Sequence, residues 1–111
     1  MPYIYNITFF TGEKHFHELT RLLLSDFLKE TRKDKSVKFL HLSRVLSNPA
    51  AEAMTGDEQA ISLSMQFYFD SKVSLEKWRE EGYASGMNIV STRFGEEVLH
   101  FDTVLEVLDI Q

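Results

Sequence analysis

Polar and apolar side chains alternate most regularly over residues 60–69, where Ile61, Leu63, Met65, Phe67 and Phe69 occupy every second position. A period of two predicts a strand with one face against a core. Less regular stretches, rich in β-branched and aromatic residues, predict further strands at residues 3–10, at residues 37–46 and within residues 98–108. Residues 47–59, with Gly56 and Asp57, are expected to form a long hairpin loop.

A period of three to four marks two helical regions. The first spans residues 14–30, where apolar side chains recur at Phe16, Leu19, Leu23 and Phe27. Thr11 is expected to cap this helix. Asp70 and Ser71 open the second region, residues 72–94, which Gly82 and Gly86 are expected to interrupt and Gly95 to end.

The order of these elements is β-α-β-β-α-β. It predicts an α+β, ferredoxin-like fold, in which one four-stranded antiparallel sheet carries both helices on the same face. The chain has 111 residues and shows neither an internal repeat nor a linker, so we expect a single domain over residues 1–111.

The alternation also predicts which residues share a face of the sheet. The apolar set of the last strand, Phe101 and Leu105 among it, is expected to lie buried with Phe67 beneath the helices. The opposite face mixes aromatic and small polar residues, and its candidate ligand-binding side chains are Asn6, His41, Gln66, Tyr68, His100 and Asp102. A mixed face of this kind is typical of partial burial against another sheet, which a second copy would supply. We therefore expect a homodimer that closes a dimeric α/β barrel.

The amino-acid composition excludes several classes of function. Twelve basic against seventeen acidic residues give a net charge of −5, which argues against general binding to nucleic acids or anionic membranes. There is no cysteine, so disulfides, thiolate zinc sites and thiol nucleophiles are excluded. No basic leader with an apolar core, and no apolar run long enough to span a membrane, is present, and we expect a cytoplasmic protein.

One short segment departs from this acidic character. Arg32, Lys33, Lys35 and Lys38 follow the first predicted helix. Their charges complement the negative end of that helix, as in an ordinary solvated turn. A site for an acidic ligand is the alternative.

Three motifs resemble a known family. They are Ile4-Tyr5-Asn6-Ile7-Thr8, Arg93-Phe94-Gly95 and Phe101-Asp102-Thr103-Val104-Leu105-Glu106. With the order of elements, they are similar to a Bacteroidetes-type bacterial family that carries a domain-of-unknown-function label within the dimeric α/β-barrel superfamily. Members often have His-Ile-Pro near the end of the first helix, where this chain has Ser25-Asp26-Phe27-Leu28, so no role of that histidine carries over.

The superfamily implies several activities. It includes cofactor-free oxygenases, haem-degrading enzymes, muconolactone isomerases and ligand-sensing modules, with ligands between sheet and helices or in the barrel. Haem degradation fits poorly, because the helical histidines, His15 and His17, lie at the start of the first helix. We interpret both as surface residues, since their spacing does not place them on one helical face.

Two groups of residues are candidates for chemistry. His41, His100, Asp102 and Glu106 could bind a divalent metal, relay protons, or form a structural hydrogen-bonded set that faces a dimer partner; we expect the structural set, without metal or cofactor.

The second group, Asn6, Trp78, Tyr83 and Arg93, contains residue types that could hold the ionised oxygen of an aromatic substrate. A core anchor at Trp78 and a helix-end charge at Arg93 are the structural alternatives. The hypotheses are therefore a module that binds a small molecule over its sheet, or a cofactor-independent oxygenase or isomerase acting on a small aromatic or cyclic substrate.

Overall fold

The computed structural model describes residues 2–46 and 61–110. The hairpin loop expected over residues 47–59 lies outside this described part. The elements follow one another as β1 (Tyr3–Thr11), α1 (Glu13–Leu22), η1 (Leu23–Phe27), α2 (Leu28–Thr31), β2 (Phe39–Val45), β3 (Ile61–Phe69), α4 (Lys72–Phe94), η2 (Gly95–Glu97) and β4 (Leu99–Glu106).

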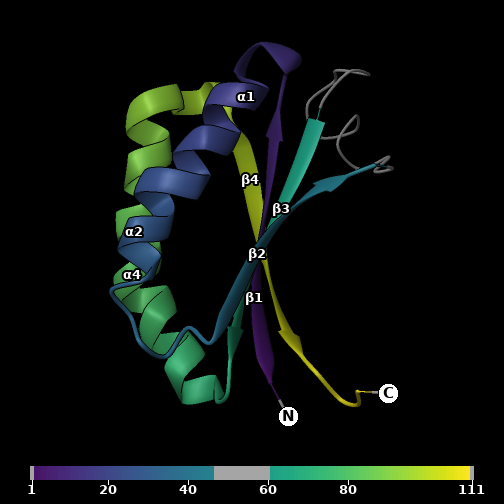
Figure 1. Ribbon diagram of the computed structural model, residues 1–111, viewed down its shortest axis with the longest axis vertical. Coiled ribbons are helices and arrows are strands. Elements are labelled where there is room, and N and C mark those ends of the chain that lie inside the picture. Colours follow the sequence, from purple (N-terminus) through teal and green to yellow (C-terminus); the bar gives the residue numbers. More distant parts are fainter. Residues whose placement is uncertain (1, 47–60, 111) are drawn as a thin grey trace.

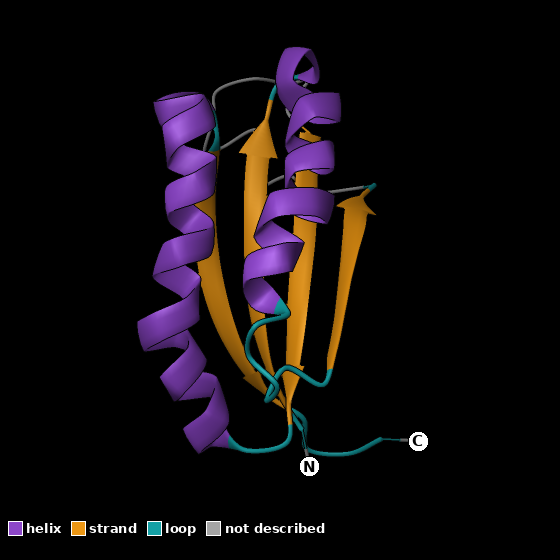
Figure 2. Ribbon diagram, turned by 60° about the vertical axis from the view of Figure 1, so that its left-hand side comes forward, coloured by secondary structure: helices purple, strands orange, loops and turns teal. Residues whose placement is uncertain are grey.

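The expected fold class is confirmed. The four strands form one antiparallel sheet in the order β2-β3-β1-β4. Both long helical segments lie on the same side of this sheet, as Figures 1 and 2 show. The other side of the sheet, which we call the open face, carries no helix from residues 2–46 or 61–110.

The core lies between the helices and the two central strands. Phe67 of β3 and Trp78 of α4 are fully buried, with ring centroids 4.4 Å apart. Phe27 from η1 also packs near Phe67, with ring centroids 6.0 Å apart. Around them are further buried apolar side chains, among them Tyr5, Ile7, Phe9, Leu19, Leu23 and Leu75. The predicted helix-facing set of β3 is thus confirmed.

The face assignment of β4 is wrong. In antiparallel pairing, directly opposed residues point to the same side of a sheet. Asp102 pairs with the buried Ile7 and therefore faces the helices, whereas Phe101 pairs with Thr8 and faces away. Phe101 and Leu105 remain 38% and 39% exposed instead of being buried beneath the helices. The reason is that β4 is an edge strand, whose apolar residues lie on the open face.

α4 is a continuous helix, although Gly82 and Gly86 were expected to interrupt it. Each glycine allows a close approach. A Cβ atom at Gly82 would lie 2.6 Å from the Trp78 ring, and one at Gly86 would lie 2.6 Å from the Phe27 ring. Packing therefore outweighs the low helix propensity of glycine. Gly95 ends the helix with a φ of 59°, as predicted.

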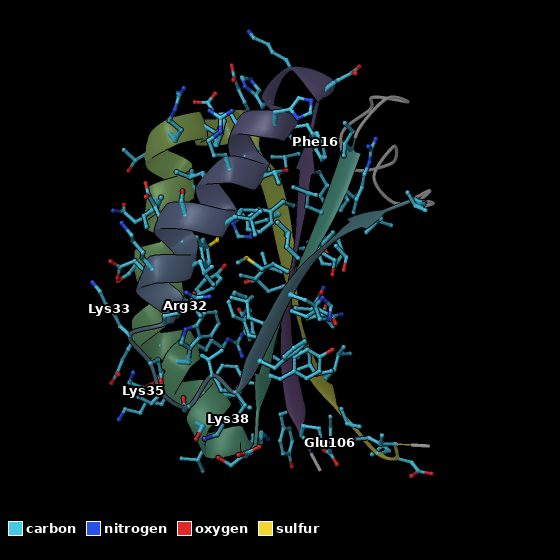
Figure 3. All side chains as sticks on the ribbon, viewed as in Figure 1. Phe16, Arg32, Lys33, Lys35, Lys38 and Glu106 are labelled. Atoms are coloured by element: carbon cyan, nitrogen blue, oxygen red, sulfur yellow. The ribbon has the colours of Figure 1, made fainter. Side chains whose placement is uncertain are left out.

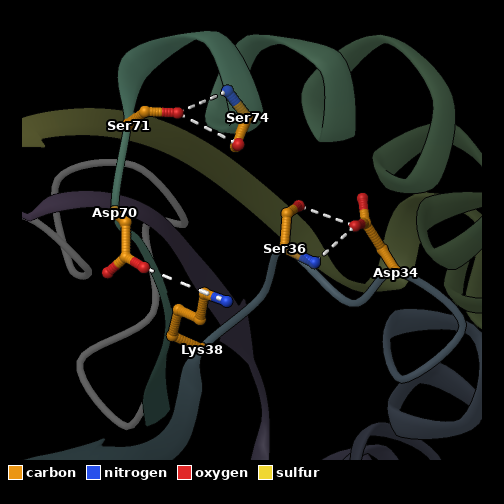
Figure 4. Close-up of polar contacts among 6 residues, drawn as sticks. All are labelled: Asp34, Ser36, Lys38, Asp70, Ser71 and Ser74. Atoms are coloured by element: carbon orange, nitrogen blue, oxygen red, sulfur yellow. Dashed lines mark hydrogen bonds and ion pairs between the residues drawn. The ribbon is translucent and has the colours of Figure 1, made fainter.

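The first helical segment has two features that the sequence did not indicate. Gly12 occupies the N-cap position without a side-chain cap, so Thr11 does not serve as the cap. The segment also contains one π-helical stretch, η1, between α1 and α2. Ser71, by contrast, caps α4 at the predicted start of the second helical region, since its Oγ accepts a hydrogen bond from the Ser74 backbone N–H at 3.1 Å (Figure 4).

Candidate functional site

The open face carries a polar centre between more apolar borders. Strand register places His41, Gln66, Asn6 and Thr103 in one row across all four strands. The next row contains Ser43, Ser64 and Thr8 and ends at Phe101. The outer rows hold mostly apolar or aromatic residues, including Phe39, Tyr68, Ile4, Leu105, Val45, Phe10 and Leu99.

His41 is the centre of one chain of hydrogen-bonding groups on this face. Its Nε2 lies 3.1 Å from the Tyr68 hydroxyl, and its Nδ1 lies 3.3 Å from the Ser43 hydroxyl. Tyr68 in turn donates to Gln66 Oε1 at 3.2 Å. Phe39 packs edge-on against Tyr68, with ring centroids 5.3 Å apart. The chain therefore joins an imidazole to a phenol beside an exposed aromatic ring.

The direction of this chain follows from its donors and acceptors. Because Tyr68 gives its proton to Gln66, the tautomer that fits carries hydrogen on Nε2 of His41 and accepts at Nδ1 from Ser43. Turning the Gln66 amide and moving the histidine proton to Nδ1 would reverse every donor. A chain that can run in either direction is suited to passing a proton or orienting a hydroxyl-bearing ligand.

Asn6 organises the adjoining polar groups. Its Oδ1 accepts from Ser64 at 2.6 Å, and its Nδ2 donates to Thr8 at 3.0 Å. We call these three residues together with Ser43, His41, Tyr68 and Gln66 the open-face network. Four of the six ligand-binding side chains predicted for the mixed face, namely Asn6, His41, Gln66 and Tyr68, are thus brought together. Their binding role remains a prediction.

His100 and Asp102 do not join this network. Both lie on the helix side of the sheet, because β4 presents the opposite set of residues to the open face. His100 Nδ1 lies 3.3 Å from Asp102 Oδ1, so the expected pairing of these two side chains is present, but at the sheet edge. Asp102 Oδ2 also accepts from the Tyr5 hydroxyl at 2.8 Å.

Asp102 belongs to a second cluster, between β4 and α4. The cluster also contains Tyr5 and Tyr83, and the ring centroids of these two tyrosines lie 5.5 Å apart. Burial raises the pKa of both phenols, and the neighbouring Asp102 carboxylate raises the pKa of each further. Arg79 lies 5.9 Å from the Tyr5 ring and opposes this shift in pKa. Neutral phenols held on a carboxylate are the stable state of this cluster.

The second predicted group does not converge. Trp78 and Tyr83 are near each other, with ring centroids 6.2 Å apart, but Asn6 lies on the open face. Arg93 forms an ion pair with Glu18 and packs on Phe94. Trp78 is a fully buried core anchor, whose Nε1 has no hydrogen-bond partner in the part of the chain that the structure describes.

The sequence interpretation missed Arg79 and three members of the open-face network, Thr8, Ser43 and Ser64. Arg79 precedes Tyr83 by four positions, a helical spacing that would have placed the two on one face of α4. The two serines lie on the predicted mixed face, where alternation alone groups them with His41 and Gln66. His17 is exposed as expected, whereas His15 is half-buried and pairs with Glu97. Within residues 2–46 and 61–110, no group of three or more His, Asp or Glu side chains is placed to hold a metal ion.

A comparison with known protein families shows the family to which the chain belongs. Residues 2–108 match the model of a domain of unknown function, DUF4286. The chain belongs to this family. A search of curated proteins finds no match. The resemblance that the three sequence motifs indicated is thereby confirmed at the level of a domain-of-unknown-function family.

Solved structures show the same fold at low identity. A protein from Deinococcus radiodurans, provisionally described as an antibiotic biosynthesis monooxygenase, superposes with a TM-score of 0.67 at 15% identity over 98% of this chain and 95% of its own. A dimeric ferredoxin-like protein from an uncultured marine organism gives 0.63 at 12% identity over 100% of both chains. A Bacillus halodurans protein of the ethyl tert-butyl ether degradation (EthD) family gives 0.62 at 18% identity over 96% and 99%.

These likenesses support the DUF4286 chain's fold and no particular reaction. None of the helices in the described residues is both long and apolar enough to cross a membrane.

Proposed function

We propose that this DUF4286 chain is a homodimeric α/β-barrel module that binds a small molecule over the open face of its sheet. The observation that carries the proposal is the open-face network, two neighbouring sets of hydrogen-bonded polar side chains bordered by apolar and aromatic ones. Within a face-to-face dimer these polar groups would lose water and need partners, which a ligand or the second copy can provide. A cytoplasmic location and the Bacteroidetes-type origin are part of the same proposal.

The apolar border supports the dimer. Phe39 is 58% exposed, and Leu99, Phe101 and Leu105 are 38–39% exposed on the same face. Apolar side chains at both outer rows of one sheet form a surface suited to a second apolar surface. The dimeric ferredoxin-like protein from the marine organism shows that this fold occurs in dimers. Symmetric self-association is the commonest way to cover such a face.

Adjacent residues of β4 provide a matched test of the dimer. Leu105 and Val104 are each 39% exposed, but Leu105 points to the open face and Val104 to the helix side. Light scattering of the wild type is expected to report twice the 12.9 kDa of the chain. Leu105→Lys should shift the protein to monomer, whereas Val104→Lys should leave it dimeric. A monomeric wild type, or equal effects of the two variants, would reject the dimer.

Ligand binding over the open face is tested with 1-naphthol, an aromatic compound with one hydroxyl group. Naphthalene, which lacks the hydroxyl group, is the control. Chemical shifts of the Gln66 and Ser64 amides are expected to change with 1-naphthol and far less with naphthalene. Tyr68→Phe removes one hydroxyl from the network while keeping its ring, and should weaken naphthol binding. Shifts confined to other parts of the chain would contradict binding over the sheet.

A second candidate function is a cofactor-independent oxygenase or isomerase. It is favoured by the His41–Tyr68 contact, because a neutral imidazole beside the open face could remove a proton from a phenol or from a carbon next to a carbonyl. Conversion of a cyclic substrate by the wild type and its loss in His41→Gln, with folding intact, would support this reaction. Binding without conversion under both aerobic and anaerobic conditions would leave the binding module alone.

A further inference from the structure

A separate groove lies between the first helical segment and the edge strand β2. Its volume is about 440 Å³, within the range of pockets that hold small molecules. The wall is largely aliphatic and comes from both sides of the groove, with Leu23, Leu24, Leu28, Leu40, Leu42 and Met65. Leu24 is 54% exposed, so part of this apolar surface is in contact with water.

Basic side chains border the same groove. Arg32, Lys35 and Lys38 line it, and Figure 3 shows that they follow the connection between α2 and β2 together with Lys33. These four are a third of the chain's twelve basic residues, in a protein with a net charge of −5. The connection is therefore a local reversal of charge beside an apolar cavity.

Two of these cations have partners. Lys33 pairs with Glu30 at 2.8 Å, and Lys38 lies 3.9 Å from Asp70 (Figure 4). Arg32 and Lys35 form no ion pair with any residue that the structure describes. These two charges at the groove are thus available to an anion.

The remaining polar groups of the connection are engaged in holding it. Asp34 also lines the groove, but its Oδ1 accepts from both the backbone N–H and the hydroxyl of Ser36, at 2.9 and 2.6 Å (Figure 4). The carbonyls of Leu28, Glu30 and Thr31 already accept backbone N–H groups. The cations are therefore not required to satisfy the end of the helix, although its dipole favours them there.

The π-helical stretch η1 lies against the groove. Its first two residues, Leu23 and Leu24, both line the cavity, while Phe27 at its end stays buried in the core. Single π-helical turns within an α-helix interrupt regular hydrogen bonding and occur frequently at functional sites. This local irregularity is a second observation at the same place as the unpaired charges.

We propose that this groove binds a small amphiphilic carboxylate. The aliphatic part of the ligand lies along the leucines, and its carboxylate lies against Arg32 and Lys35. An ion with one charged end fits a cavity whose wall is apolar and whose border is basic. The groove lies on the side of β2 that faces the helices, where Leu40 and Leu42 point, although Phe39 and His41 also line it. The ligand inferred here is a carboxylate held by Arg32 and Lys35, so the inference goes beyond the function proposed above.

Octanoate and 1-octanol test the inference, since the two probes share a chain length and differ in charge. Binding to the wild-type protein is followed by amide chemical shifts, below the concentration at which octanoate forms micelles. Octanoate is expected to shift the amides of Leu24, Lys35 and Leu40. The double variant R32Q/K35Q should bind octanoate at least tenfold more weakly than the wild type, whereas its affinity for 1-octanol should change less than twofold.

A matched variant separates local from general electrostatics. R21Q/K72Q removes the same two positive charges at exposed positions outside the groove. It should leave octanoate affinity within twofold of the wild type. Equal weakening by both double variants, or no shift of the groove amides, would overturn the inference. Octanoate shifts centred on Gln66 and Ser64 would also overturn it, and would at the same time support ligand binding over the open face.

Discussion

β3 and β4 flank the same strand, β1, but present their apolar residues to opposite sides of the sheet. The apolar set of β3 faces the helices, and Phe67 and Phe69 are fully buried there. The apolar set of β4 faces away, and Phe101 and Leu105 keep more than a third of their surface. The inward positions of β4 hold His100 and Asp102, with Val104 as an apolar residue among them.

The contrast between β3 and β4 shows the limit of hydrophobic alternation as a guide to burial. A period of two establishes which residues share a face, but it does not establish which face is covered. β3 lies between β2 and β1 beneath the helices, so its apolar set is driven inward. β4 lies at the edge, where the helix side admits polar groups and the open face offers a second apolar surface. An apolar set that remains exposed on an edge strand is the kind of surface that the proposed dimer would cover.

Replacing one phenylalanine with alanine in β3 and one in β4 should give the largest difference in the free energy of unfolding. Phe67→Ala should lower the free energy of unfolding by roughly 3–5 kcal/mol, because it removes a fully buried ring and leaves a cavity. Phe101→Ala should cost less than about half of that in the monomer, because the ring is already 38% exposed. Urea unfolding at several protein concentrations measures both. Equal losses in dilute protein would mean that β4 also faces the core.

Adding one methyl group above β3 should have a smaller effect. Gly86→Ala places a Cβ within 2.6 Å of the Phe27 ring, which packs on Phe67, and overpacking of this kind costs roughly 1–3 kcal/mol. Gly12→Ala is the comparison, since a Cβ there meets no atom within 4 Å and any loss comes from the weaker preference of alanine for the N-cap position of α1. Thermal unfolding of the two variants makes the comparison. A Gly86→Ala protein more stable than wild type would show that helix propensity outweighs packing in α4.

Much of the fold follows from local pattern. The order of the elements, the residues of β3 that share a face, the start of α4 after Asp70 and Ser71, and the glycine at its end each depend on neighbouring residues only. The continuity of α4 does not, because Gly82 and Gly86 look like helix breakers until Trp78 and Phe27 are seen against them.

The residues of the candidate site likewise fall into a part that the sequence predicted correctly and a part that it did not. Asn6, His41, Gln66 and Tyr68 were predicted together, because they lie on strands whose faces the alternation assigns correctly. His100 and Asp102 were misplaced with β4. The groove beside β2 combines residues from a helix, a turn and a strand, so no single stretch of sequence indicates its shape. Only the charges at residues 32–38 indicated an acidic ligand as an alternative.

Asp102, the inward carboxylate of β4, should affect the stability of the protein at alkaline pH. The pKa of Tyr5 and of Tyr83 is raised in the folded protein by burial and by Asp102, whereas unfolded tyrosines ionise near pH 10. The unfolded chain therefore loses these protons first. Their stabilising contribution is complete below about pH 10 and is lost as pH rises toward the folded pKa.

The midpoint of urea unfolding is accordingly expected to fall from pH 10 upward. The double variant Y5F/Y83F should show a shallower fall, because it removes both phenols. Asp102→Asn should also make the fall shallower, since it removes the charge that opposes phenolate formation. An unchanged slope in both variants would separate Asp102 from the two tyrosines and would place β4 differently.

The smallest contrast compares two polar residues of the open face. Ser64 of β3 donates to Asn6 at 2.6 Å, so Ser64→Ala leaves a half-buried amide oxygen without this donor and should cost about 1 kcal/mol. Thr103 of β4 lies in the row of Asn6, and Thr103→Val keeps its shape, so its effect should stay within about 0.5 kcal/mol. Urea unfolding in dilute protein, where the proposed dimer would contribute least, measures the two. A larger loss at Thr103 would mean that the polar centre extends to β4, and that the edge strand contributes to the network as fully as β3 does.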